Sequence, residues 1–181
     1  MKRQHTLIVM VEDHPGVLNR VVSLLRRRSF NIDSITVGHS EQPGVSRMTI
    51  VLRGTDADIE QAGKQLYKLM EVLKVIDLTD QPVVAHEMAI VKVAAKAQQR
   101  QEVLLVAQMF NARVLDASPN TIMIEATGTV EQIESLLTML RSFGIRELAR
   151  TGAIAMSKGS GNITSKGFAG ADQYAGSAVA D

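Results

Sequence analysis

Apolar positions in the first half of the chain alternate between strand-like and helix-like spacing. Residues 6–11 form a continuous apolar run of strand length. From Pro15 to about Arg28, apolar residues recur every third or fourth position, which predicts an amphipathic helix. The runs "NIDSITV", "VSRMTIVLR" and "LKVIDL" are strand-like, and "DADIEQAGKQLYKLMEV" before the last of them has helical spacing. The order predicted for residues 4–79 is therefore β-α-β-β-α-β.

Residues 86–158 repeat this order, with strand-like runs at "EMAIVKVAA", "ARVLDAS" and "NTIMIEATG" and helical spacing in "QQRQEVLLVAQMF" and "TVEQIESLLTMLRSF". The segment "IRELARTGAIAM" closes the second unit. Identical residues recur at a single offset of 74 positions: Gly54-Thr55 as Gly128-Thr129, Ile59-Glu60 as Ile133-Glu134, and Leu66 as Leu140. Three matches in one register indicate two consecutive copies of one fold.

This pattern predicts an α+β protein made of two tandem ferredoxin-like βαββαβ units, each with two helices on one face of a four-stranded antiparallel sheet. Residues 80–85 are predicted to be a linker. Residues 159–181 are rich in Gly, Ser and Ala without an apolar period, so we expect a disordered tail. The first strand is apolar at nearly every position, so its helix-free face needs a cover. A homodimer through the N-terminal unit would supply one.

Composition excludes several classes of function. A net charge of +1 over 181 residues offers no bulk attraction to nucleic acid or to an anionic membrane. The absence of cysteine excludes disulfides, thiolate catalysis and the CxxC motif of copper chaperones. RNA-binding ferredoxin-like domains stack bases on aromatic side chains of the central strands, which are lacking here. The short apolar run after the basic start is neither a signal peptide nor a membrane span, and we expect a cytoplasmic location.

Few residues suggest catalysis or metal binding. The four histidines, His5, His14, His39 and His86, lack metal-ligand spacing and are predicted to be isolated surface residues. The sequence has no nucleophile elbow, phosphate-binding loop or dinucleotide glycine pattern. The arginines at 26–28 are predicted to form a solvated face at a helix end, with an acidic patch of a partner as the alternative. We therefore predict neither a catalytic residue nor a metal site.

One candidate site stands out at the first strand-to-helix junction, "EDHPGVLNRV". Pro15 fits the first turn of a helix, and Gly16 permits close approach of the backbone. The amide groups of Gly16, Val17 and Leu18 would then point outward at the positive helix end, which suits a carboxylate. Asp13 could cap the helix or meet an ammonium group. The same residues also fit a plain helix cap with a Pro-Gly turn.

Asn31 follows the same helix and offers a donor and an acceptor near the sheet edge. With the junction, it could hold both charged ends of an α-amino acid. Leu18, Ile32 or Ile35 would then surround the side chain of that amino acid.

The ordered motifs of this chain resemble the small, regulatory subunit of acetolactate synthase, also called acetohydroxyacid synthase. The resemblance rests on "EDHPGVLNRVVSLLRRRSFNIDSITVG", "SRMTIVLRG" and "QLYKLMEVLKVIDL", extends from residue 3 to about 158, and includes the closing "ARTGAIAMSKG". The first unit is similar to an ACT domain, a ferredoxin-like module that senses amino acids as a dimer.

The resemblance implies a subunit that is no enzyme by itself. It would bind and activate the large catalytic subunit and confer feedback inhibition by valine, or by leucine or isoleucine. Thiamine diphosphate, Mg and FAD would belong to the catalytic subunit, with no cofactor in this chain. The loop "RGTDAD", residues 53–58, is at a position that touches the catalytic subunit in this family.

The effector site implied by the resemblance lies at the interface of two ACT domains. It maps to the following residues of this chain: Asp13, His14, Pro15, Gly16, Val17, Leu18, Asn31 and Ile32. The second unit has "QQRQEV" where the first has its Pro-Gly loop, so it is predicted to lack an amino-acid site and to contact other subunits. The alternative function is a stand-alone ACT-domain sensor that regulates another enzyme or a transcription factor.

Overall fold

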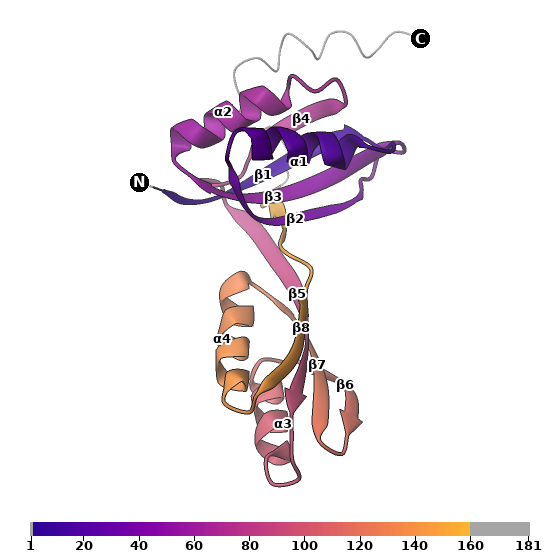
Figure 1. The fold of residues 1–181 in the computed structure, drawn as a ribbon, viewed down its shortest axis with the longest axis vertical. Coiled ribbons are helices and arrows are strands. Elements are labelled where there is room, and N and C mark those ends of the chain that lie inside the picture. The colour runs from indigo at the N-terminus through magenta and orange to yellow at the C-terminus, as the bar shows by residue number, and fades with distance from the viewer. Residues whose placement is uncertain (1, 160–181) are drawn as a thin grey trace. The chain divides into compact units, whose positions relative to one another are not determined.

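The structure is a computed structural model, and it describes residues 2–159. Within that range the chain forms four helices and nine strands (Figure 1). In chain order these are β1 (Arg3–Glu12), α1 (Val17–Arg27), β2 (Asn31–His39), β3 (Val45–Gly54), α2 (Asp56–Leu66), β4 (Val72–Asp77), β5 (Val83–Ala94), α3 (Arg100–Met109), β6 (Arg113–Ser118), β7 (Thr121–Gly128), α4 (Val130–Arg141), β8 (Ile145–Arg150) and β9 (Ile154–Ser157). The predicted tail lies outside the described residues, apart from Gly159.

The chain divides into two compact units. The first comprises the residues up to Val84 together with the segment that begins at Ala155, and the second comprises Ala85–Ile154. The sequence-based boundary at residue 158 therefore differs from the observed one, because the chain returns to the first unit at Ala155. Each unit contains the antiparallel sheet and two helices of a ferredoxin-like fold, so the predicted α+β class and the internal repeat are confirmed.

In the first unit the strand order is β2-β3-β1-β4, and α1 and α2 lie on one face of the sheet (Figure 1). Alternation in β1 turns Leu7, Val9 and Val11 toward the helices, where they are buried. Val17, Val21 and Leu25 recur every fourth residue of α1 and complete this core. Burial of each such side chain stabilises the fold by about 1.5–3 kcal/mol.

Strand β1 begins at Arg3, three residues before the predicted start. His5 therefore falls on the helix-facing side in register with Leu7, and it is only 1% exposed. Its Nδ1 lies 3.2 Å from Thr79 Oγ1, and its Nε2 lies 3.3 Å from the carbonyl oxygen of Gly54. The prediction that all four histidines are surface residues is wrong for His5. Its ring can be buried because both nitrogens have hydrogen-bond partners in the protein in place of water.

The face of this sheet away from the helices is also covered. Ile8, Val51 and Ile76 project to that side, yet they are at most 5% exposed. Arg47 lies on the same side and donates from Nη2 to the carbonyl oxygen of Ala155 at 2.7 Å. The returning segment thus covers part of this face. These apolar side chains are therefore already buried within one chain, and the homodimer stays a prediction.

In the second unit the sheet order is β6-β7-β5-β8. Strand β9, which pairs with β5, begins at the last residue of this unit, Ile154. The closing segment "IRELARTGAIAM" is thus two strands, β8 and β9, separated at Gly152 with a φ of 80°. The repeat extends to the helix caps. Thr55 and Asp58 form a capping box at α2, and Thr129 and Gln132 form the same box at α4.

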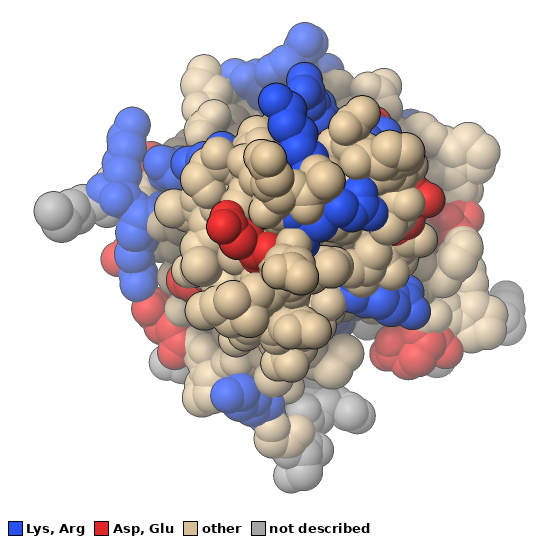
Figure 2. Space-filling view, turned by 90° about the horizontal axis from the view of Figure 1, so that it is seen from below, with Lys and Arg blue, Asp and Glu red and all other residues tan. Residues whose placement is uncertain are grey.

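Charged side chains of both signs are interspersed over the face shown in Figure 2, with uncharged surface between them. This distribution agrees with the net charge of +1. No helix among residues 2–159 is long and apolar enough to cross a membrane. The same described range contains no group of three or more His, Cys, Asp or Glu residues that could hold a metal ion.

Candidate functional site

The junction between β1 and α1 is tied to two neighbouring loops through backbone hydrogen bonds. The amide of Glu12 donates to the carbonyl oxygen of Glu71 at 2.9 Å, and the amide of Asp13 donates to that of Gly44 at 2.8 Å. The amide of His14 turns back to the carbonyl oxygen of Glu12 at 3.2 Å. These bonds hold the loop against the end of the sheet and direct the following residues into the helix.

Gly16 is the N-cap of α1 and has a φ of 92°, a left-handed conformation that favours glycine. The helix begins at Val17, so Pro15 precedes the cap and is not in the first turn as predicted. In the described part of the chain, no side chain forms a capping hydrogen bond here, and the first turn contains no acid. The first amides of α1 therefore have no intrahelical or capping acceptor, and the helix dipole makes this end positive.

Asp13 does not cap the helix, contrary to one of the two predicted roles. Its Oδ2 lies 3.1 Å from Nδ1 of His39, at the end of β2. The Nε2 of His14 lies 3.1 Å from the carboxylate of Glu12. Sequence reasoning missed His39, because its pairing depends on the sheet order that places the end of β2 beside this loop.

The two apolar residues of the loop point in different directions. Val17 is 3% exposed and belongs to the core, while Leu18 is 44% exposed. Successive residues of a helix are about 100° apart, so Leu18 lies on the flank opposite Arg20 and Leu24, which face α2. Of the predicted apolar contacts in this loop, only Leu18 is available to a ligand.

Asn31 and Ile32 lie at the other end of the same sheet. Asn31 pairs in register with Arg53, near the start of β1, whereas the loop follows the end of β1. The intervening helix has 11 residues, which corresponds to about 16 Å. The side-chain Nδ2 of Asn31 donates to Asp33 Oδ1 at 3.0 Å, and Ile32 packs against the core. Within one chain, α1 therefore separates Asn31 and Ile32 from the loop residues 13–18, and the predicted set of eight residues stays a prediction.

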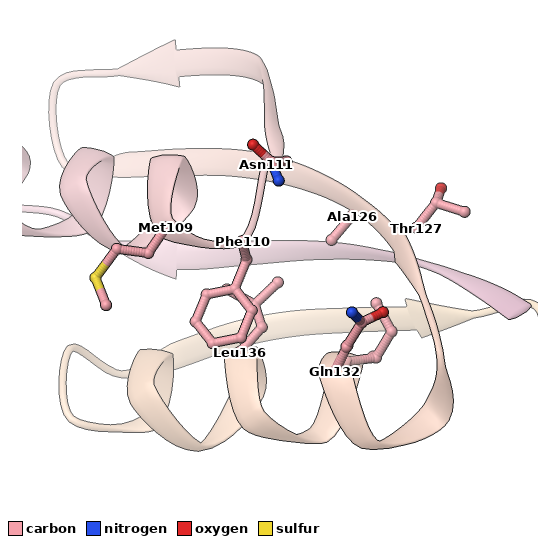
Figure 3. Close-up of a pocket in the computed structure, with 8 residues that line it drawn as sticks. Met109, Phe110, Asn111, Ala126, Thr127, Gln132 and Leu136 are labelled. Atoms are coloured by element: carbon pink, nitrogen blue, oxygen red, sulfur yellow. The ribbon is translucent and has the colours of Figure 1, made fainter.

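The second unit contains a hollow of about 330 Å³ between the end of α3 and the start of α4 (Figure 3). Its polar groups come from Asn111, Thr127 and Gln132, and its apolar lining comes from Met109, Phe110, Ala126, Ile133 and Leu136. Among the described residues that line it, none carries a charge that could pair with the ammonium or carboxylate of an amino acid. The hollow gives no support for an amino-acid site in this unit.

Comparison with known proteins assigns both units. Residues 7–74 match the family described as an AHAS small subunit-like ACT domain, and residues 86–159 match the small subunit of acetolactate synthase. The probable acetolactate synthase small subunit of Methanothermobacter thermautotrophicus is 49% identical over 157 residues, covering 86% of this chain and 94% of that protein. The chain belongs to the acetolactate synthase small-subunit family. All eight predicted site residues fall inside the matched ACT domain.

Further relatives agree with this membership. The acetolactate synthase small subunit of Mycolicibacterium smegmatis is 47% identical over 155 residues, covering 86% of this chain and 91% of that one. The crystal structure of the acetolactate synthase small subunit of Thermotoga maritima superposes with a TM-score of 0.82 at 40% identity, covering 87% of this chain and 99% of that one. The resemblance identified from the sequence is confirmed across both units.

Proposed function

We propose that this chain is the regulatory subunit of acetolactate synthase. It binds the catalytic subunit, raises its activity and confers feedback inhibition by valine, without catalysing a reaction itself. The observation that carries this proposal is family membership over both units, including the ACT domain with its uncapped helix start at Gly16. Thiamine diphosphate, Mg and FAD belong to the catalytic subunit in this proposal.

The geometry of the loop supports an amino acid as the effector. The carboxylate of valine would accept hydrogen bonds from the first amides of α1, where no acidic side chain competes. The side-chain oxygen of Asn31 or the carboxylate of Asp13 would accept from the ammonium group. Leu18 and Ile32 would contact the isopropyl group, whose burial contributes about 1.5–3 kcal/mol.

Because one chain separates these groups, the site requires a second copy. Strand β2 is an edge of its sheet, and its nine residues include no lysine or proline of the kind that protects an edge. If two copies pair antiparallel along β2 about a two-fold axis near Ile35, Asn31 of one copy faces His39 of the other. His39 already contacts Asp13, so Asn31 and Ile32 of the second copy would reach the effector loop.

Regulation would follow from linkage. If valine binds one arrangement of the homodimer more tightly, it shifts the complex with the catalytic subunit toward that arrangement. The shift can be no larger than the difference in valine affinity between the two arrangements.

The interchain site can be tested by calorimetric titration of valine, leucine and isoleucine into the full chain. We expect valine to bind the wild-type protein, and Gly16→Asp to abolish binding by placing a carboxylate where the ligand carboxylate belongs. Asn31→Ala should also abolish it. Mixing the two variants after exchange of subunits should restore about one quarter of the sites, because half the dimers are mixed and each has one intact site. Equal valine binding by wild type and Gly16→Asp would refute the site.

A second experiment tests the function itself. Adding this protein to the purified catalytic subunit should raise the acetolactate synthase rate, and valine should then lower it. Addition without any effect on rate or on valine sensitivity would refute the proposed function. If valine still binds in that case, the result would favour the alternative of an amino-acid sensor that acts on another enzyme or a transcription factor.

A further inference from the structure

A second hollow, of about 440 Å³, lies between α1 and α2 in the first unit. It faces the flank of α1 opposite Leu18, and Arg20 is a lining residue that also lies next to Gly16 of the effector loop. The lining combines cationic, amide, hydroxyl and apolar side chains: Asn19, Arg20, Ser23, Leu24, Arg27, Arg28, Gln65 and Leu69. This volume is within the range of small-molecule sites.

Three guanidinium groups dominate the lining, and little within the described residues neutralises them. Arg20 pairs with the carboxylate of Glu71 at 3.0 Å. Arg28 donates to the neutral amide oxygen of Gln65 at 3.3 Å. The guanidinium group of Arg27 has no hydrogen-bond or ion-pair partner among residues 2–159. The hollow therefore has an excess of positive charge.

The position of α1 does not account for all of this charge. The C-terminal end of a helix is equivalent to roughly half a negative charge, which favours arginines in the last turn. A solvent-exposed cluster of arginines at that end would therefore need no ligand. Arg20, however, lies two turns earlier, beyond the reach of that effect. Leu24 is partly buried between the arginines and gives the hollow an apolar floor.

We propose that this hollow binds a small organic phosphate, such as a diphosphate ester. Guanidinium groups match phosphate oxygens with pairs of parallel hydrogen bonds, and both Arg27 and Arg28 are available for such contacts. The hydroxyl group of Ser23 donates to Asn19 Oδ1 at 3.4 Å, which leaves the amide hydrogens of Asn19 as further donors. The organic part of the ligand would contact Leu24.

The test uses the full chain with pyrophosphate and ADP as probes, titrated by calorimetry at low ionic strength. We expect both to bind with dissociation constants below about 1 mM, and ADP to bind more tightly because of its organic part. Arg27→Gln should weaken binding about tenfold, which corresponds to the loss of one charge-assisted contact. Arg26→Gln is the matched control, since it removes the same charge from the same helix turn outside the hollow. It should weaken binding less than about twofold.

Circular dichroism is the check that each variant is folded. Arg28→Gln provides a second variant in the hollow. Equal weakening by Arg26→Gln and Arg27→Gln would show diffuse attraction to the surface and overturn the site. Absence of binding by pyrophosphate and ADP would overturn it as well. Tighter binding of citrate or of a hexaglutamate peptide would overturn the assignment of a phosphate in favour of a carboxylate or an acidic protein segment.

Discussion

Gly16 allows a direct test of how the backbone shapes the effector loop. Its φ of 92° lies in the left-handed region, which a residue with a Cβ adopts at an energetic penalty. Space is not the limitation, because the nearest atom to an added Cβ, outside the adjacent residues of the chain, is Nη2 of Arg20 at 3.9 Å. The penalty of Gly16→Ala therefore comes from the backbone alone.

We expect Gly16→Ala to lower the free energy of unfolding by about 1–2 kcal/mol. For a unit of this size, that loss lowers the melting temperature by roughly 4–8 °C per kcal/mol. The measurement is urea and thermal denaturation of the full chain followed by circular dichroism, at one protein concentration so that dimerisation contributes equally.

Two glycines serve as controls. Gly44 has a φ of 76° and open space around it, so Gly44→Ala should lose a similar free energy of unfolding. Gly38 also has open space but no positive φ, so Gly38→Ala should change the free energy by less than about 0.5 kcal/mol. If Gly38→Ala destabilises as much as Gly16→Ala, or if Gly16→Ala is neutral, the backbone argument is refuted.

Two further predictions concern charged side chains. Glu87 is 5% exposed and bonded to Arg150, so Glu87→Gln should lower the free energy of unfolding of the second unit by about 1–3 kcal/mol, measured by denaturation. Glu147→Gln is the control at a surface ion pair, and it should lower this free energy by less than about 1 kcal/mol. At the start of α2, hydrogen bonds from the backbone amide and the hydroxyl group of Thr55 hold the pKa of Asp58 below its ordinary value of 3.8. The stability that these bonds contribute is fully present above pH 3.8, and it is lost as the pH falls through the lowered pKa. Amide exchange in α2 should therefore rise as the pH falls below about 4 in the wild-type chain. Asp58→Asn, which has no carboxyl group to protonate at this position, should show no such rise, and equal increases in both proteins would contradict this.

Most elements could be predicted because their signal is local. The alternation in β1 and the fourfold spacing of Val17, Val21 and Leu25 follow from the period of each element, whatever surrounds it. The two capping boxes are also local, since Thr55 and Thr129 bond to residues three positions later. The start of β1 was predicted too late because the polar residues Arg3 to His5 fit either a strand or the segment before it. The start of α1 was predicted too early because Pro15 fits either a turn or the first helical position.

What the sequence alone determined, then, is the order of elements, the repeat, the family and the loop around Gly16. Only the tertiary structure decided that Asn31 lies an entire helix away from that loop, because the direction of α1 over the sheet separates them. It also decided that the segment from Ala155 returns to the first unit and that Arg20 and Arg27 face a hollow against α2. These contacts join residues distant in the chain, and no spacing along the sequence encodes such distances.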